Sequence, residues 1–149
     1  MATINLEVFF MAARQGNIKC LKYCLDNGVD IHSANDLALR LAAENGEMEV
    51  VKFLLENGAN ILALDDCLLR LASLNGKVQT VINLLEYGSC SYEAKLYSMY
   101  NAILYGHIDI VKLLLENGVS PYDNDGAVLK VVKMCKYDDI VELFENYLN

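Results

Sequence analysis

The sequence contains no tryptophan and one proline, and although 54% of its 149 residues are hydrophobic, charged residues interrupt every long apolar run. A membrane-spanning helix needs about 18 consecutive apolar residues, so none is expected. The near absence of proline and the lack of serine-rich or glycine-rich tracts argue against linkers and disordered tails. Residues 1–6 carry no basic residue before an apolar run, so we expect no secretory signal. These absences together predict a chain that is compact throughout.

Basic residues are also few. Twelve lysines and arginines face twenty aspartates and glutamates, which gives a net charge of −8. Nucleic-acid binding depends on basic residues that neutralise phosphates. The densest basic segment, Lys130 to Lys136, is followed at once by Asp138 and Asp139. We therefore expect no nucleic-acid partner. An acidic surface that keeps the protein soluble explains the charge, and attraction of a basic protein partner is the alternative.

The five cysteines form no recognisable disulfide or metal framework. Their number is odd, no Cys-x-x-Cys pair occurs, and no histidine stands at zinc-binding spacing. In the repeat described below, Cys20, Cys24 and Cys67 occupy positions that hold valine, isoleucine or leucine elsewhere, so we expect buried thiols. The sequence predicts no metal and no cofactor. It also predicts a reducing, intracellular and cytoplasmic location.

Two series of glycines each step by thirty residues along the chain. They are Gly16, Gly46, Gly76 and Gly106, and Gly28, Gly58, Gly88 and Gly118. Segments 45–58 and 105–118 share the pattern Val-Lys-x-Leu-Leu-Glu-Asn-Gly at their ends. A fixed period over most of the chain indicates an internal repeat.

Each thirty-residue unit is predicted to be a helix, a tight turn, a second helix and a loop. The first helix is typified by residues 36–45, with Asp36 as its N-cap. The first glycine series ends this helix in a left-handed conformation. Apolar residues at Met48, Val51 and Leu54 define one face of the second helix, and Asn57-Gly58 ends it. Such short helix pairs bury their apolar faces only by stacking on neighbouring units.

The segment 106–119, Gly-His-Ile-Asp-Ile-Val-Lys-Leu-Leu-Leu-Glu-Asn-Gly-Val, resembles an ankyrin repeat. The first helices depart from the family, because residues 37–40 and 67–70 lack its Thr-Pro-Leu-His signature. The period is three residues short, and the connecting loops hold only seven residues. This variant resembles the ankyrin repeats of giant DNA viruses (mimivirus-like).

The resemblance implies an all-α solenoid of about five stacked helix-turn-helix repeats with truncated hairpin loops. It covers nearly the whole chain as a single domain, 1–149. The repeats are roughly 5–35, 36–65, 66–95, 96–125 and 126–149, and the last acts as a C-terminal cap.

No constellation of catalytic residues is recognisable. His107 stands at the Gly-His turn of the family, where the ring holds the turn, and His32 has no nucleophile or carboxylate at catalytic spacing. The adjacent carboxylates Asp65 and Asp66 fit capping and solvation better than acid–base work. The glycines are never clustered as in a phosphate-binding loop. We therefore predict that the protein is not an enzyme.

Tyrosine is concentrated in one region, with six of nine residues between positions 87 and 122. Tyr100 replaces Arg40 and Arg70 of other repeats, and Leu74 and Leu104 stand where other repeats have polar residues. Ankyrin proteins usually bind through the concave face made by first helices and loops, and tyrosine is frequent among residues that dominate binding. The predicted partner-binding residues are Tyr87, Tyr92, Tyr97, Tyr100, Tyr105, Leu74, Leu104, Arg40 and Arg70. The alternative is that these rings repack the core of a degenerate fourth repeat.

The sequence thus predicts a monomeric, non-catalytic protein–protein interaction module whose concave face binds a protein partner. A viral origin makes that partner a host protein. The alternative is a structural component that associates with itself through Phe9, Phe10 and Met11.

Overall fold

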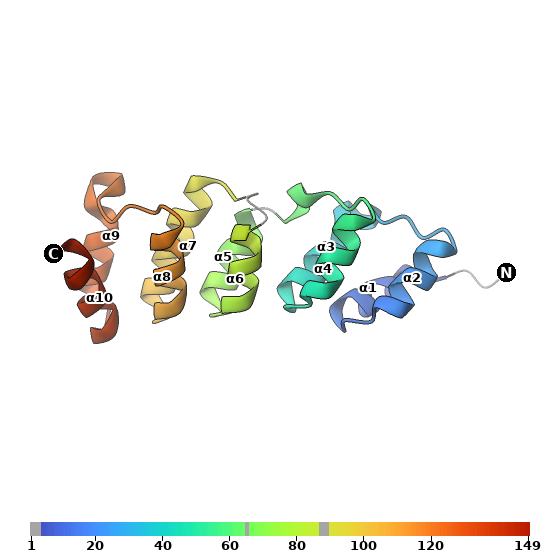
Figure 1. The fold of residues 1–149 in the computed structure, drawn as a ribbon, viewed down its shortest axis with the longest axis horizontal. Coiled ribbons are helices and arrows are strands. Elements are labelled where there is room, and N and C mark those ends of the chain that lie inside the picture. The colour runs from blue at the N-terminus through green and yellow to red at the C-terminus, as the bar shows by residue number, and fades with distance from the viewer. Residues whose placement is uncertain (1–3, 65, 87–89) are drawn as a thin grey trace. The chain divides into compact units, whose positions relative to one another are not determined.

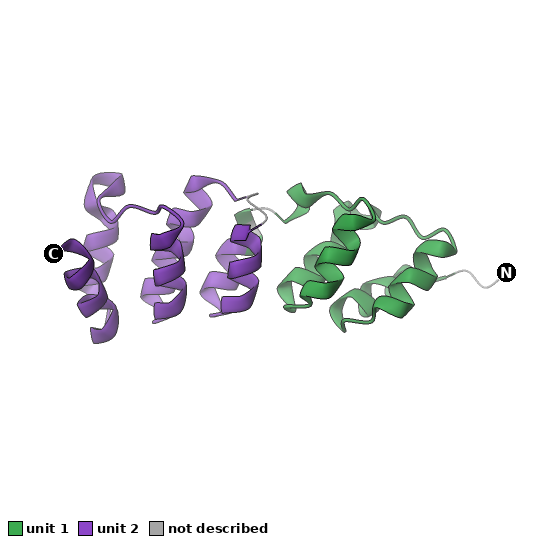
Figure 2. Cartoon of the chain, viewed as in Figure 1, with its two compact units in different colours: residues 1–68 green, residues 69–149 purple. Residues whose placement is uncertain are grey.

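The computed structural model describes residues 4–64, 66–86 and 90–149, and the side chain of Cys67 is not described. The described residues form ten α-helices and one short 3₁₀ helix, with no β-strand (Figure 1). This confirms the predicted all-α helical repeat architecture. The chain divides into two compact units, residues 1–68 and 69–149 (Figure 2).

Unit 1 contains two helix pairs and the 3₁₀ helix. The elements are α1 (Leu6–Arg14), α2 (Ile18–Asp26), α3 (Ser33–Glu44), α4 (Met48–Glu56) and η1 (Ile61–Ala63). Helix α1 packs on α2 and α3, and α3 packs on α4 and η1. Phe9, Leu21, Leu39 and Leu54 are fully buried and form the centre of this core.

Unit 2 contains three helix pairs. They are α5 (Asp66–Leu74, in this unit from Leu69) with α6 (Val78–Glu86), α7 (Tyr92–Leu104) with α8 (Ile108–Glu116), and α9 (Asp123–Met134) with α10 (Asp138–Leu148). In Figure 1 the first helix of each pair lies behind the second, so the first helices form one layer and the second helices another. Helix α7 packs on α8 and α9, and α8 also packs on α6 and α10. Leu84, Met99, Leu114 and Phe144 are buried between the helices.

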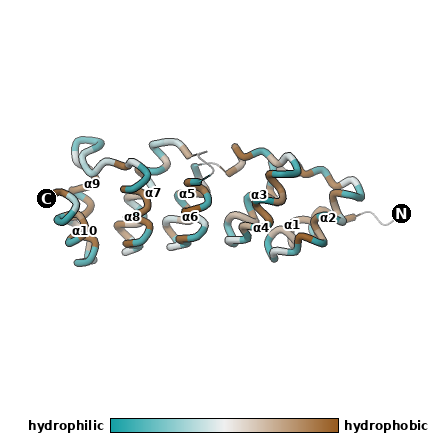
Figure 3. The backbone as a smooth tube through the Cα atoms, viewed as in Figure 1, coloured by the Kyte–Doolittle hydropathy of each residue, from teal (hydrophilic) through white to brown (hydrophobic). Residues whose placement is uncertain are grey.

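Hydrophobic and hydrophilic segments alternate along the helices (Figure 3), as expected of helices that bury one face. The alanines that recur at one register position, Ala12, Ala42, Ala72 and Ala102, are all buried. A small side chain at this position allows neighbouring helices to approach closely. Glu145, which replaces a leucine of the other repeats, is exposed.

Both predicted turn types are present. Gly46, Gly76 and Gly106 follow the first helices with φ of 74°, 68° and 77°. At the end of α4, the Ala59 N–H donates to the Leu54 carbonyl at 3.0 Å and the Gly58 N–H donates to the Leu55 carbonyl at 3.1 Å. This pair of bonds is the Schellman cap, which needs the positive φ of 96° found at Gly58.

The starts of the first helices differ between repeats. In α3 and α9 the second to fourth residues are left-handed, with φ between 52° and 71° at 34–36 and 124–126. Five of these six residues are asparagine, aspartate or glycine, which tolerate this conformation, and Ala34 is the exception. In α7 Ala94 is equivalent to Ala34, but the next two residues are Lys95 and Leu96, which are strong helix formers. Helix α7 therefore begins with a regular turn, and the Ser91 Oγ caps it by accepting the Ala94 N–H at 3.1 Å.

The predicted N-cap role of Asp36 is wrong. Its buried carboxylate instead accepts the backbone N–H of Asn60 at 2.8 Å, and Nδ1 of His32 lies 3.1 Å from the same oxygen. The backbone of Asp36 is left-handed, with φ of 56° and ψ of 39°, rather than in the extended conformation typical of an N-cap residue. Asp36 thus joins α3 to the following loop.

The cysteines only partly follow the prediction. Cys24 is fully buried, whereas Cys20 is half-buried because its side chain lies near the surface of α2. Burial, together with the neighbouring Cys20 thiol, raises the pKa of the Cys24 thiol. Cys24 is therefore an unreactive neutral thiol at physiological pH.

Candidate protein-binding surface

The first helices of unit 2 carry a group of exposed apolar side chains. Tyr97 is 55% exposed, Leu104 54%, and Tyr105 56%. Positions 97, 100 and 104 recur at helical spacing, so one face of α7 presents Tyr97, the half-buried Tyr100 and Leu104. We call Tyr92, Tyr97, Tyr100, Leu104 and Tyr105 the tyrosine surface.

The opposite face of α7 supplies the core. Ser98, Met99, Ala102 and Ile103 have no more than a trace of exposed surface. The exposed Tyr97 ring is therefore separate from the face of α7 that is buried in the core.

Contacts from α5 hold the ring of Tyr97. The Arg70 guanidinium lies 5.8 Å from the Tyr97 ring centroid, in cation–π geometry. The Asn101 side-chain amide donates to the Arg70 carbonyl at 3.3 Å, which joins α7 to α5. Tyr97 and Tyr100 also pack edge to face, with centroids 6.1 Å apart.

The other end of the tyrosine surface is tied to α9 and the loop before it. The Tyr92 hydroxyl donates to the Asp123 carboxylate and accepts the Ser120 N–H at 3.1 Å. The Asn124 side-chain amide donates to the Tyr100 hydroxyl at 3.4 Å. These bonds fix two of the rings before any partner binds.

An open pocket of about 560 Å³ lies where α7 meets the start of α9. Its lining residues are Tyr92, Glu93, Leu96, Tyr97, Tyr100, Asp123 and Asn124.

Leu74 is less accessible than Leu104. It is half-buried, and its carbonyl accepts a hydrogen bond from Nε2 of His107 at 3.0 Å. His107 thus bridges the turn of one helix pair to the end of the preceding first helix, which agrees with the turn-holding role expected for it.

Family comparison matches two parts of the chain. Residues 3–65 match the family described as ankyrin repeats (3 copies), and residues 95–123 match the single ankyrin repeat. Together these matches span more than half of the sequence. The chain is an ankyrin repeat protein. No curated protein matches it. Ankyrin repeats are generally protein–protein interaction modules.

Two other predicted site residues are Arg40, which belongs to unit 1, and Tyr87. Arg40 is half-buried. It lines a pocket of about 370 Å³ together with Asp36 and Asn60. Tyr87 lies outside the described residues. The structure therefore brings together Arg70, Tyr92, Tyr97 and Tyr100.

The proposed self-association group is corrected in part. Phe9 is fully buried against its neighbours, so it contributes nothing to a surface. Phe10 is half-buried and Met11 exposed, and both line an open pocket of about 330 Å³ with Glu7, Arg14 and Leu41.

Several residues of unit 2 that are exposed or that contact the tyrosine surface were not among the predicted site residues. Met134 is 80% exposed and occupies the register position of Leu74 and Leu104, so the thirty-residue period could have identified it. Leu71 is exposed as well. No sequence pattern pointed to Asp123 and Asn124. Their contact with α7 depends on the regular helical turn with which α7 begins, and α3 and α9 lack that turn.

No group of three or more histidine, cysteine, aspartate or glutamate side chains in residues 4–64, 66–86 and 90–149 is placed to hold a metal ion. Within the same ranges no helix is long and apolar enough to cross a membrane.

Proposed function

We propose that this ankyrin repeat protein binds a protein partner through the tyrosine surface. The observation that supports this most directly is the exposure of Tyr97, Leu104 and Tyr105 beside a complete core. Contiguous exposed apolar groups are typical of interaction sites. Tyrosine is suited to this role because its ring buries a large area and its hydroxyl keeps a hydrogen bond.

The fixed orientation of the rings also favours binding. Hydrogen bonds hold Tyr92 and Tyr100, and the Arg70 guanidinium packs on Tyr97. A side chain that is already ordered loses less conformational entropy when the partner arrives. The thirty-residue period favours a viral origin, which would make the partner a host protein.

We expect Tyr97→Ala/Tyr105→Ala to lose the partner that the wild-type protein retains. Both side chains are more than half exposed, so the variant should keep its thermal stability. The measurement is affinity capture from cell lysate with quantitative mass spectrometry of the retained proteins.

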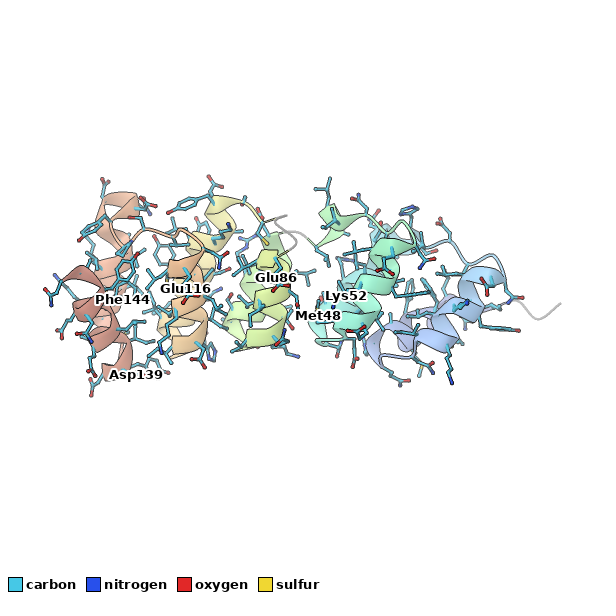
Figure 4. All side chains as sticks on the ribbon, viewed as in Figure 1. Met48, Lys52, Glu86, Glu116, Asp139 and Phe144 are labelled. Carbon is cyan, nitrogen blue, oxygen red and sulfur yellow. The ribbon has the colours of Figure 1, made fainter. Side chains whose placement is uncertain are left out.

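Tyr147→Ala is the matched control. Tyr147 is 54% exposed, close to the 55% of Tyr97, but it lies on α10 in the layer of second helices. Glu86 and Glu116 mark the same layer on α6 and α8 (Figure 4). A partner lost equally by the control, or no partner specific to the wild type, would contradict the proposal.

Self-association is the second candidate, favoured by the exposed apolar residues of α1. Leu6, Val8 and Met11 are all exposed, and Met11 lines the pocket with Phe10. If the protein associates with itself through these residues, the mass of the wild-type protein in solution rises with its concentration. The Met11→Glu protein then keeps the monomer mass. A mass independent of concentration would eliminate it.

A further inference from the structure

The pocket between α7 and α9 has the composition of a cation-binding site. Three of its seven lining residues are tyrosines, Tyr92, Tyr97 and Tyr100, and two are carboxylates, Glu93 and Asp123. None of the lining residues is lysine or arginine. Aromatic faces and carboxylates both attract positive charge.

Among residues 4–64, 66–86 and 90–149, no ion pair involves the carboxylate of Glu93 or Asp123. Asp123 accepts a hydroxyl hydrogen from Tyr92. Because a carboxylate offers about four acceptor positions, both groups keep capacity for further donors.

A guanidinium already packs on one of these rings. Arg70 lies 5.8 Å from the Tyr97 centroid, on the side of α5. Glu93 precedes Tyr97 by one turn of α7, and Asp123 begins α9. Both carboxylates line the pocket, whereas Arg70 does not, so the pocket itself is acidic.

We infer that this pocket takes the guanidinium of an arginine side chain from the protein partner, an inference that rests on the proposed function. A guanidinium carries five N–H donors in a plane, so it stacks on a tyrosine ring and donates to a carboxylate at the same time. A trimethylated lysine has no N–H to donate, and lysine has no plane to stack. The net charge of −8 also favours a basic partner segment.

The test uses short peptides as probes. Acetyl-Gly-Arg-Gly-amide is titrated into the full chain labelled with ¹³C in its tyrosine rings, and ring chemical shifts are followed by NMR. Parallel titrations use the same peptide with citrulline, lysine or trimethyl-lysine in place of arginine. Citrulline is the key comparison, because it has nearly the shape of arginine without its charge.

We expect the arginine peptide to shift the rings of Tyr92, Tyr97 and Tyr100, and to leave Tyr23 and Tyr147 unchanged. Its affinity should exceed that of the citrulline peptide by at least about threefold, the size of one exposed cation–π or ion-pair contact. Glu93→Gln should weaken arginine binding by a similar factor. Glu116→Gln, an exposed carboxylate on α8, should not. Added salt should weaken binding further.

Three results would overturn the inference. They are no shift at the pocket, equal binding of arginine and citrulline, and lysine or trimethyl-lysine binding as tightly as arginine. If the partner is lost in Tyr97→Ala/Tyr105→Ala while the arginine peptide fails to bind, the proposed function stands and this inference fails. If the arginine peptide binds as expected but no partner is captured, the pocket chemistry stands and the proposed function fails.

Discussion

Leu84→Ala is expected to lower the free energy of unfolding by about 2–5 kcal/mol. Leu84 lies in α6 and is 1% exposed, in the core of unit 2. Truncation removes its apolar contacts and leaves a cavity that close-packed helices fill only partly. Because each helix pair is stabilised by its neighbours, the loss should extend to the adjacent pairs. Urea denaturation followed by circular dichroism measures the effect.

Leu104→Ala is the matched control for this substitution. It removes the same atoms, but Leu104 is more than half exposed on α7. We expect a change within about 0.5 kcal/mol, as for most surface positions. A Leu84→Ala protein that unfolds at the wild-type midpoint would show that the register of the repeats is wrong.

Gly76→Ala is expected to lower the free energy of unfolding by more than the replacement of a left-handed glycine that has open space around it. Its φ of +68° imposes about 1–2 kcal/mol of strain on alanine. A Cβ at this position would also lie 2.7 Å from the His107 ring. The ring must then move and lose its hydrogen bond to the Leu74 carbonyl, which adds about 1 kcal/mol.

Gly118→Ala separates the two contributions. Its φ is +90°, but a Cβ there meets no atom within 4 Å, so only the backbone strain applies. In a His107→Ala background the excess cost of Gly76→Ala should disappear, which a double-mutant cycle measures. Equal costs for the two glycines in the wild-type background would mean that His107 does not link adjacent helix pairs.

The repeat period explains why so much of the fold could be predicted. A left-handed glycine follows the first helix in each of the first four repeats, so Gly46, Gly76 and Gly106 carry a signal that single sequences rarely provide, whereas α9 ends without one. The buried alanines follow from the same register. The register of the tyrosines is less informative, because Tyr100, which replaces Arg40 and Arg70, is half-buried, whereas the exposed Tyr97 stands where Leu37 and Ala127 stand.

The remaining features depend on contacts that the period does not encode. We attribute the regular first turn of α7 to Lys95 and Leu96, which replace left-handed Asn35-Asp36 of α3 and Asp125-Gly126 of α9, and this turn carries Tyr92, whose hydroxyl bonds to Asp123. The prediction of an N-cap at Asp36 is wrong because the amino-acid sequence does not reveal that this residue has a left-handed φ. The burial of Phe9 depends on the packing of α1 against α2 and α3.

The most direct test of partner binding through the tyrosine surface is the Kd of the captured partner for wild type, Tyr97→Ala and Tyr147→Ala, measured by calorimetry. A tyrosine that anchors an interface contributes about 2 kcal/mol or more, which is roughly a thirtyfold change in Kd. The account predicts such an increase for Tyr97→Ala and an unchanged Kd for Tyr147→Ala. An unchanged Kd for Tyr97→Ala, or an equal increase for both variants, would contradict it.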